Sequence, residues 1–317
     1  MKVLVTGGNG FVGKHLLSNL EGLNNYQTFT YGRKKSHLNF EHHFGDFSQH
    51  DDFSLALKGI DVVIHCAGRS HVMKDSSTDP LADYRLVNKD FVIRLTRAAA
   101  FHGVKRFIFI SSIKVNGEFT LSGVPFNISS PYSASDFYGL SKAEAEVELR
   151  TLSSLVGIEF VIIRPCLIYG PSVKANFASL MNLVSKGVPL PFGCITQNKR
   201  SLVSVTNLVD LIITCIDHPK AVNQVFLASD DHDISTSEMV REMAKALGKS
   251  SCQLPVPVWC YKLAGKLFNK SDVVDRLTGS LQVDISHTKD TLGWKPPQTL
   301  QEGFKQTAQA FLQAKTK

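Results

Sequence analysis

The stretch Lys2–Gly13, KVLVTGGNGFVG, decides how this chain begins to fold. Its apolar residues Val3–Val5 form a short run that is typical of a buried strand. Glycines interrupt the run, and apolar residues then recur at helical spacing from Phe11 to Leu20. Strand, glycine turn and helix in this order are the context that a dinucleotide-binding loop requires.

The glycines have a chemical purpose if the loop binds a pyrophosphate. Backbone N–H groups must come within hydrogen-bonding distance of the phosphates, and a Cβ atom would block that approach. The N-terminus of the following helix adds free N–H groups and a partial positive charge. Two spacings fit, Gly8-x-Gly10-x-x-Gly13 and Gly7-x-x-Gly10-x-x-Gly13. An ordinary glycine turn is the alternative, but the position between strand and helix favours a dinucleotide site.

A basic run follows the second predicted strand, Gln27–Tyr31. About 20 residues past the glycine loop, an acidic residue binds the 2′-hydroxyl of NAD, whereas an arginine accommodates the 2′-phosphate of NADP. This chain has Arg33 there, which indicates tolerance of NADP, although an arginine can also stack on adenine without the phosphate. Asp46 could accept a hydrogen bond from the adenine amine or simply cap a helix. The predicted cofactor is NAD or NADP, and a solvated basic loop is the alternative.

The composition limits the class of protein. The 317 residues are 43% hydrophobic, which suits one large or two ordinary globular domains. The net charge of +7 is spread out without an aromatic-interleaved basic run, so we expect no nucleic-acid partner. No apolar run is long enough to cross a bilayer, no signal peptide precedes the first strand, and the six cysteines form no CxxC pair. We therefore expect a cytoplasmic protein with no metal site and no membrane partner.

Predicted strands alternate with predicted helices through the first two thirds of the chain. That pattern is typical of a parallel sheet covered on both faces, so we expect a Rossmann-type doubly wound α/β sheet. Its domain would comprise residues 1–172, with 201–230 returning to it. A smaller, mostly helical domain of residues 173–200 and 231–317 would bind substrate. Further buried strands are expected at 61–65, 106–112, 158–164 and 224–228.

Tyr138 and Lys142 lie four residues apart in the predicted helix Phe137–Val156, so they share one face. An ammonium beside a phenol stabilises the phenolate and lowers the tyrosine pKa towards a range useful for proton transfer. A surface Tyr–Lys pair is the alternative. The position after the predicted strand Arg106–Ser112, which ends in two hydroxyls, favours a catalytic pair.

Together, the glycine loop, the serines at 111–112 and YGLSK at 138–142 resemble the extended short-chain dehydrogenase/reductase family. The resemblance is greatest to its nucleotide-sugar 4-epimerases and 4-ketoreductases, and it extends over nearly the whole chain. It includes HCAG at 65–68, SSIKVNG at 111–117, RPCLIYGP at 164–171, ANF at 175–177, RSLVSVTNLVD at 200–210 and LGW at 292–294.

The resemblance implies roles for three residues at the reacting carbon. Tyr138 would be the general acid and base at the 4-oxygen of the sugar. Lys142 would hold the nicotinamide ribose and lower the pKa of Tyr138. Ser112, five residues before Gly117, would hydrogen-bond the same sugar oxygen.

The resemblance also implies binding residues. Asn176 and Arg200 would hold the diphosphate of a UDP-sugar, because a guanidinium fork suits a phosphate. For Arg276, a solvated helix charge is favoured over a second diphosphate contact. The predicted cofactor-binding set is Gly7, Gly10, Phe11, Val12, Gly13, Arg33, Asp46, Asn88, Tyr138, Lys142 and Pro165.

Departures from the family pattern narrow the reaction. Dehydratases of the family follow the serine hydroxyl with an acid pair, and 3,5-epimerases have a cysteine there. This chain has Ile113 and Lys114 at those places, so neither elimination nor 3,5-epimerisation is expected. Asn116 replaces the tyrosine that usually precedes Gly117, and the sequence does not explain that change.

The predicted function is that of a UDP-hexose 4-epimerase, acting on UDP-glucose or a UDP-N-acetylhexosamine through a transient 4-keto sugar in polysaccharide-precursor metabolism. The alternative is an NADPH-dependent 4-reductase of UDP-4-keto sugars, which Arg33 mildly favours. A non-catalytic NAD(P)-binding protein is a remote alternative, because such proteins tend to lose the Tyr or the Lys. By the resemblance we expect a homodimer, for which the predicted helices Pro80–His102 and Phe137–Val156 are candidates.

Overall fold

A computed structural model describes residues 1–47, 52–70, 78–121 and 123–316. Within these residues, seven strands form one parallel sheet in the order β3-β2-β1-β4-β5-β6-β9. The strands are β1 (Lys2–Thr6), β2 (Gln27–Gly32), β3 (Glu41–Phe44), β4 (Val62–His65), β5 (Arg106–Ile110), β6 (Glu159–Pro165) and β9 (Gln224–Ala228).

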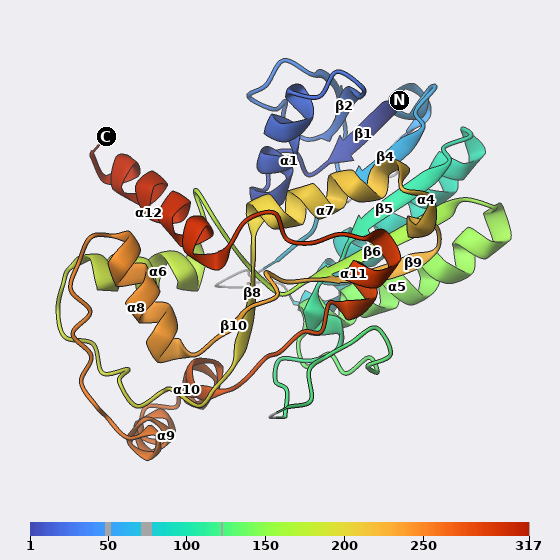
Figure 1. The fold of residues 1–317 in the computed structure, drawn as a ribbon. Coiled ribbons are helices and arrows are strands. Elements are labelled where there is room, and N and C mark those ends of the chain that lie inside the picture. Colours follow the sequence, from blue (N-terminus) through green and yellow to red (C-terminus); the bar gives the residue numbers. More distant parts are fainter. Residues whose placement is uncertain (48–51, 71–77, 122, 317) are drawn as a thin grey trace.

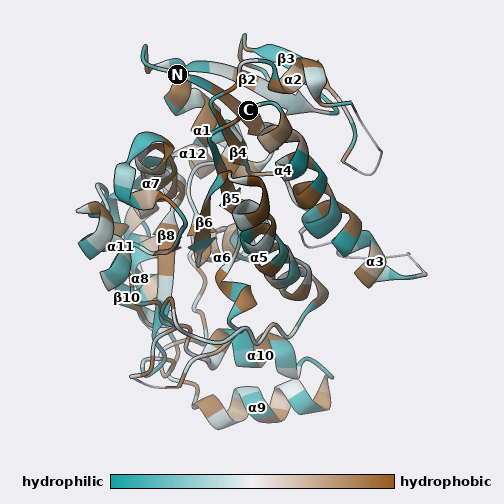
Figure 2. Cartoon of the chain, turned by 90° about the vertical axis from the view of Figure 1, so that its right-hand side faces the viewer, coloured by the Kyte–Doolittle hydropathy of each residue, from teal (hydrophilic) through white to brown (hydrophobic). Residues whose placement is uncertain are grey.

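Helices cover both faces of this sheet. Helices α1 (Phe11–Glu21) and α7 (Val205–Asp217) lie on one side, and α4 (Phe91–Phe101) and α5 (Phe137–Val156) lie on the other (Figures 1 and 2). Side chains of β1 alternate between the two buried cores, because successive residues of a strand point to opposite faces. The predicted doubly wound α/β sheet is therefore confirmed.

The direction of the strand order reverses between β1 and β4. From β1 the chain proceeds outward to β2 and β3, and it then returns to β4 and continues to β9 on the other side. In sheets of this kind the loops after the two central strands separate at their carboxyl ends and leave a crevice there. The glycine loop follows β1, and residues 66–70 follow β4, so both border this crevice.

The helix predicted over Pro80–His102 is interrupted. The structure divides it into α3 (Pro80–Arg85), a π-helical turn η1 (Leu86–Asp90) and α4. The π turn contains Asn88, whose buried side chain hydrogen-bonds the backbone of Arg69. A single inserted turn of this type redirects a side chain, and periodicity in the sequence does not reveal it.

A second group of elements lies beside the main sheet (Figure 1). A three-stranded sheet contains β7 (Leu167–Tyr169), β8 (Arg200–Ser204) and β10 (Asp233–Ile234). A third core surrounds Tyr169, Phe177 and Phe304. The helices of this part are α6 (Ala175–Ser185), α8 (Thr236–Ala246), α9 (Val258–Leu267), α10 (Ser271–Thr278) and α12 (Leu300–Thr316), and the remaining short helices are α2 (Ser54–Leu57), η2 (Ile113–Val115), η3 (Pro219–Ala221) and α11 (Ser286–Leu292).

The division of the chain into two domains stays a prediction. Strand β8 belongs to the small sheet, whereas α7 and β9 return to the main one. In the part of the chain that the structure describes, no helix combines the length and apolar composition needed to cross a membrane.

Candidate active site

Gly7 and Gly13 let the loop backbone approach its neighbours more closely than a side chain would permit. Gly7 follows β1 with φ of +73°, and a Cβ atom there would lie 2.5 Å from the backbone nitrogen of Ala67. A Cβ atom on Gly13 would lie 2.2 Å from the carbonyl oxygen of Gly7. Both separations are below any normal Cβ contact, so the loop requires glycine at both positions.

The structure also distinguishes between the two glycine spacings. Gly10 caps α1 and donates its N–H to the Gly7 carbonyl, with an N···O distance of 2.8 Å. A Cβ atom on Gly8 would instead meet the flexible side chain of Leu17 first. The backbone therefore depends on Gly7-x-x-Gly10-x-x-Gly13. The first N–H groups of α1 have no acceptor within the helix, so this loop fits a phosphate.

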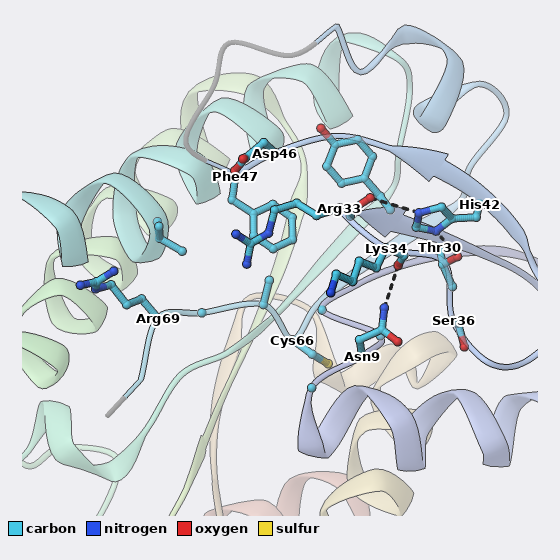
Figure 3. Close-up of a pocket in the computed structure, with 18 of the residues that line it drawn as sticks. Asn9, Thr30, Arg33, Lys34, Ser36, His42, Asp46, Phe47, Cys66 and Arg69 are labelled. Carbon is cyan, nitrogen blue, oxygen red and sulfur yellow. Dashed lines mark hydrogen bonds between the residues drawn. The ribbon is translucent and has the colours of Figure 1, made fainter. Parts of the chain in front are cut away.

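A cavity of about 840 Å³ lies at the crevice beyond the central strands. It is lined by the glycine loop, by the segment that follows β2 and by residues 66–69 after β4 (Figure 3). Its volume falls within the range of about 300–1,000 Å³ that is usual for small-molecule sites. Position, size and the glycine cradle all fit a dinucleotide.

Basic side chains line one end of this cavity. In Figure 3 the guanidinium of Arg33 lies beside the ring of Phe47, and Lys34 reaches into the same space. The Asn9 side chain donates to the Lys34 carbonyl at 2.7 Å, which ties the glycine loop to the basic run. Asp46 borders the same cavity. Arg33 and Asp46 both line this cavity, and their assigned contacts with a cofactor stay predictions.

Asn88 organises the wall of the cavity. Its Oδ1 accepts from the Arg69 N–H at 2.7 Å, while its Nδ2 donates to the Arg69 carbonyl and to Ser141 Oγ, both at 3.0 Å. A Cβ atom on Gly68 would lie 3.2 Å from Asn88 Oδ1 and 3.3 Å from Lys142 Nζ. Lys142 Nζ therefore lies close to the cavity wall at Gly68, which brings the predicted catalytic pair near the crevice.

Tyr138 is placed by the start of α5. Asp136 caps this helix, and its Oδ1 accepts from the Gly139 N–H at 2.7 Å. A Cβ atom on Gly139 would lie 2.8 Å from the Lys114 carbonyl, so glycine lets the helix pack against the η2 turn. This packing brings the Tyr138 phenol close to the Ser112 hydroxyl, which acts to lower the pKa of the phenol. The structure thus brings together two of the three predicted catalytic side chains.

The pKa of Tyr138 differs from the prediction. Burial raises it to about 12, and the Ser112 hydroxyl offsets only part of that effect. The predicted lowering by Lys142 is wrong for this structure because the ammonium has other partners. Lys142 Nζ donates to the Ile110 carbonyl at 3.0 Å and lies 4.4 Å from the ring centroid of Phe109.

Lys142 itself is strongly affected by its surroundings. Only 2% of its surface is exposed, and this burial lowers its pKa to about 8, although Cys66 and Glu146 raise it in part. A lysine in such a site can exchange its proton near neutral pH. Lys142 is therefore a buried amine, close to Gly68, whose protonation can change near neutral pH.

Ser111 points to a buried network instead of the cavity. Its hydroxyl donates to Glu146 Oε1 at 2.5 Å, and Tyr132 donates to Oε2 at 2.9 Å. Arg164 donates to Glu146 through Nε and Nη2, the latter at 2.6 Å, and to Asn116 Oδ1 at 3.1 Å. Asn116 thus has a structural role that the sequence did not reveal: it holds Arg164.

The predicted substrate residues lie on separate elements. Arg200, at the start of β8, donates from Nη1 to the carbonyls of Arg276 and Gly279 at 2.9 and 3.2 Å. Arg276 on α10 lies 3.4 Å from a Glu118 carboxylate oxygen. Asn176 is exposed in the first turn of α6. The structure therefore brings Arg200 and Arg276 together, and the roles of all three stay predictions.

The other predicted cofactor residues occupy packing positions. Phe11 and Val12, in the first turn of α1, are partly buried against the core on that face. Pro165 is buried at the end of β6, where it pairs in register with Ala228 of β9. These residues flank the crevice, and their contacts with a cofactor stay predictions.

A comparison with known families decides what kind of protein carries this site. The family described as "NAD dependent epimerase/dehydratase family" matches residues 3–228, which is more than half of the chain. The chain belongs to the NAD-dependent epimerase/dehydratase family. The predicted resemblance to extended short-chain dehydrogenases/reductases is thereby confirmed.

Individual relatives agree with this assignment. A UDP-glucose 4-epimerase of Vibrio cholerae is 63% identical over 316 residues, covering 98% of this chain and 96% of the relative. The structure of a UDP-glucuronic acid 4-epimerase from Bacillus cereus in complex with NAD has a TM-score of 0.79 at 20% identity, covering 99% of both chains. That of a UDP-glucose 4-epimerase from Thermotoga maritima with UDP-glucose has a TM-score of 0.78 at 21% identity, also covering 99% of both chains. The solved structures show that the fold is shared.

Three features that position α5 in this epimerase/dehydratase family member were not predicted from the sequence. They are the Asp136 cap, the close approach at Gly139 and the Glu146–Arg164 ion pair. The first two had a local signal, an acid and a glycine flanking Tyr138. The ion pair had none, because its partners lie 18 residues apart on different elements.

Proposed function

We propose that this chain is a UDP-glucose 4-epimerase that uses NAD. One observation carries the proposal: the Tyr138 phenol lies close to the Ser112 hydroxyl, and Lys142, on the same helix as Tyr138, lies close to the wall of a glycine-cradled cavity. The Vibrio cholerae relative, at 63% identity over 98% of this chain, supports UDP-glucose as the substrate.

The glycine cradle and the cavity wall would hold the cofactor. Gly7, Gly10 and Gly13 leave room for the pyrophosphate, and Lys142 at Gly68 would reach the nicotinamide ribose. When bound, NAD supplies a reversible hydride acceptor and a positively charged ring. The positive charge of that ring would favour the Tyr138 phenolate. It would thereby oppose the effect of burial, which raises the pKa of Tyr138.

Tyr138 would act as base and then as acid at the 4-oxygen of the sugar. It would take the hydroxyl proton as the carbon is oxidised and return it after the 4-keto sugar has turned over in the site. Ser112 would hydrogen-bond the same oxygen and keep it beside the phenol. The net result is inversion at carbon 4, with no consumption of cofactor.

The diphosphate would be the fixed point around which the sugar turns. Arg200 and Arg276 are held close together by the hydrogen bond from Arg200 Nη1 to the Arg276 carbonyl. Two guanidinium groups from β8 and α10 suit a diphosphate, with Asn176 as a third contact. Only this end of the substrate needs to be bound identically before and after the turn.

We assign NAD as the working cofactor, and Arg33 would also permit binding of NADP. We assign the enzyme to the cytoplasm and to a homodimer. Exposed Val147 and Leu155 on α5 leave part of that helix available for such an interface.

The test is to incubate the purified protein with UDP-glucose, follow formation of UDP-galactose, and identify the dinucleotide released on denaturation. We expect conversion without added cofactor and release of NAD. Consumption of NADPH with a UDP-4-keto sugar, by a protein that releases no dinucleotide, would instead identify a reductase.

A further inference from the structure

Helix α9 has an apolar stripe on its outer surface. Trp259, Leu263 and Leu267 are 66%, 62% and 77% exposed, and their spacing of four residues places them on one face. Phe268, at the C-terminal end of the helix, is also largely exposed. Large apolar side chains gathered in this way on a surface usually mark a contact with another partner.

The opposite side of α9 is already occupied. Gly265 is buried, and a Cβ atom there would lie 2.8 Å from a methyl carbon of Val274 on α10, so the two helices pack closely at this point. Figures 1 and 2 show α9 at the outer edge of the molecule, beyond α10 and far from the main sheet. The stripe is therefore a protruding ridge that α10 does not cover.

The ridge is surrounded by positive charge. From residue 243 to residue 271 the chain has five lysines and no aspartate or glutamate. Lys262 and Lys266 project beside the stripe, since helical spacing places them within a quarter turn of Trp259, and Lys270 follows the helix. The first acids after this segment are Asp272 and Asp275, on α10.

This charge pattern discriminates between possible partners. Two copies of this chain that met through their α9 ridges would bring lysines together without acids on either helix to neutralise them. An anionic bilayer would neutralise the lysines and bury the tryptophan and leucines among its acyl chains. A helix with Trp and Leu on one side and Lys beside them is the pattern of helices that lie in a membrane interface.

We propose that α9 docks this protein on the surface of an anionic phospholipid membrane. The apolar stripe would enter the headgroup boundary, and Lys262, Lys266 and Lys270 would contact lipid phosphates. The absence of a spanning segment led to the prediction of no membrane partner, but peripheral docking needs no such segment. The proposal does not depend on the reaction that the enzyme catalyses.

The test is flotation of the full-length protein with vesicles of phosphatidylcholine alone or mixed with phosphatidylglycerol. We expect flotation with the mixed vesicles and its loss at high salt. The variant K262E/K266E should bind at least about tenfold more weakly, since each lysine near an anionic surface contributes roughly a fivefold gain. The variant W259S/L263S/L267S should not float.

Matched controls keep the result interpretable. Leu55 on α2 and Leu312 on α12 are exposed apolar residues on other helices, so L55S/L312S should float like the parent. All variants should retain the UDP-glucose activity of the parent, because none of these residues lies in the proposed site. Parent protein that fails to float, or W259S/L263S/L267S that floats normally, would overturn the proposal. Dissociation of a dimer by that variant would overturn it too, since the ridge would then join two copies.

Discussion

The glycine loop and the Arg200–Arg276 region are built in opposite ways. In the loop, backbone atoms set the geometry: one continuous stretch forms the cradle, and three glycines are dictated by contacts of 2.2–3.1 Å that a Cβ atom would make. In the arginine region, the Arg200 side chain of β8 reaches the backbone carbonyl of Arg276 on α10, a residue 76 positions away. The difference teaches that the proposed cofactor end is fixed by backbone contacts, whereas the proposed substrate end depends on how separate segments pack.

The comparison extends to Tyr138, the proposed catalytic acid and base. Tyr138 has its backbone fixed as tightly as the glycine loop, by Asp136 and Gly139, but the pKa of its phenol depends on side chains.

Tyr138→Phe should have the largest effect. Removal of the hydroxyl that moves the proton should lower kcat by about 10²–10⁴-fold, while UDP affinity measured by calorimetry stays unchanged. Tyr26→Phe is the matched control, because the Tyr26 hydroxyl bonds Asp217 far from the site. If Tyr138→Phe kept kcat within a few-fold of the parent, the catalytic assignment would be wrong.

Gly13→Ala tests the rigidity of the cofactor end. Its Cβ atom would lie 2.2 Å from the Gly7 carbonyl oxygen, so we expect a loss of about 1–3 kcal/mol in urea unfolding and loss of the bound dinucleotide. Gly22→Ala, at the other end of α1, would make only a 3.6 Å contact and should change stability by about 0.5 kcal/mol or less. Equal behaviour of the two variants would show that the loop tolerates a side chain.

Lys142 makes stability depend on pH. The folded pKa of about 8 lies below the usual value of 10.5, so between these values the unfolded chain binds more protons. The parent should therefore gain stability relative to Lys142→Met as pH rises from 8 to 10.5, approaching about 3 kcal/mol. Urea unfolding of both proteins across this range measures the difference. A difference that does not vary with pH would mean that the ammonium is not desolvated.

Arg33→Asp should have the smallest effect. Replacing a cation by an anion beside the proposed adenosine site should weaken NADP binding about tenfold or more, and NAD binding less. Lys35→Asp makes the same change of charge two residues away and serves as the control. Titration of both cofactors by fluorescence gives the affinities. Equal losses of affinity for NAD and NADP would show that Arg33 does not contact the 2′-phosphate.

The sequence was most informative where local pattern controls structure. The doubly wound sheet, the glycine loop and the bounds of α5 at Phe137–Val156 follow from periodicity and turn residues. The π turn at Asn88, the position of the Lys142 ammonium and the Glu146–Arg164 pair do not. Each depends on atoms that meet only after folding, such as the Ile110 carbonyl that binds Lys142. The direction of the Tyr138 pKa shift was mispredicted for the same reason.

The central claim is that a hydride leaves carbon 4 of the sugar and returns to that carbon. Meanwhile Tyr138 takes up the proton of the 4-hydroxyl and later returns it. UDP-glucose deuterated at carbon 4 tests this directly, with mass spectrometry of the product. We predict UDP-galactose that retains deuterium at carbon 4, with none in the solvent or in added free dinucleotide. Loss of the label to either, at the rate of product formation, would contradict the account.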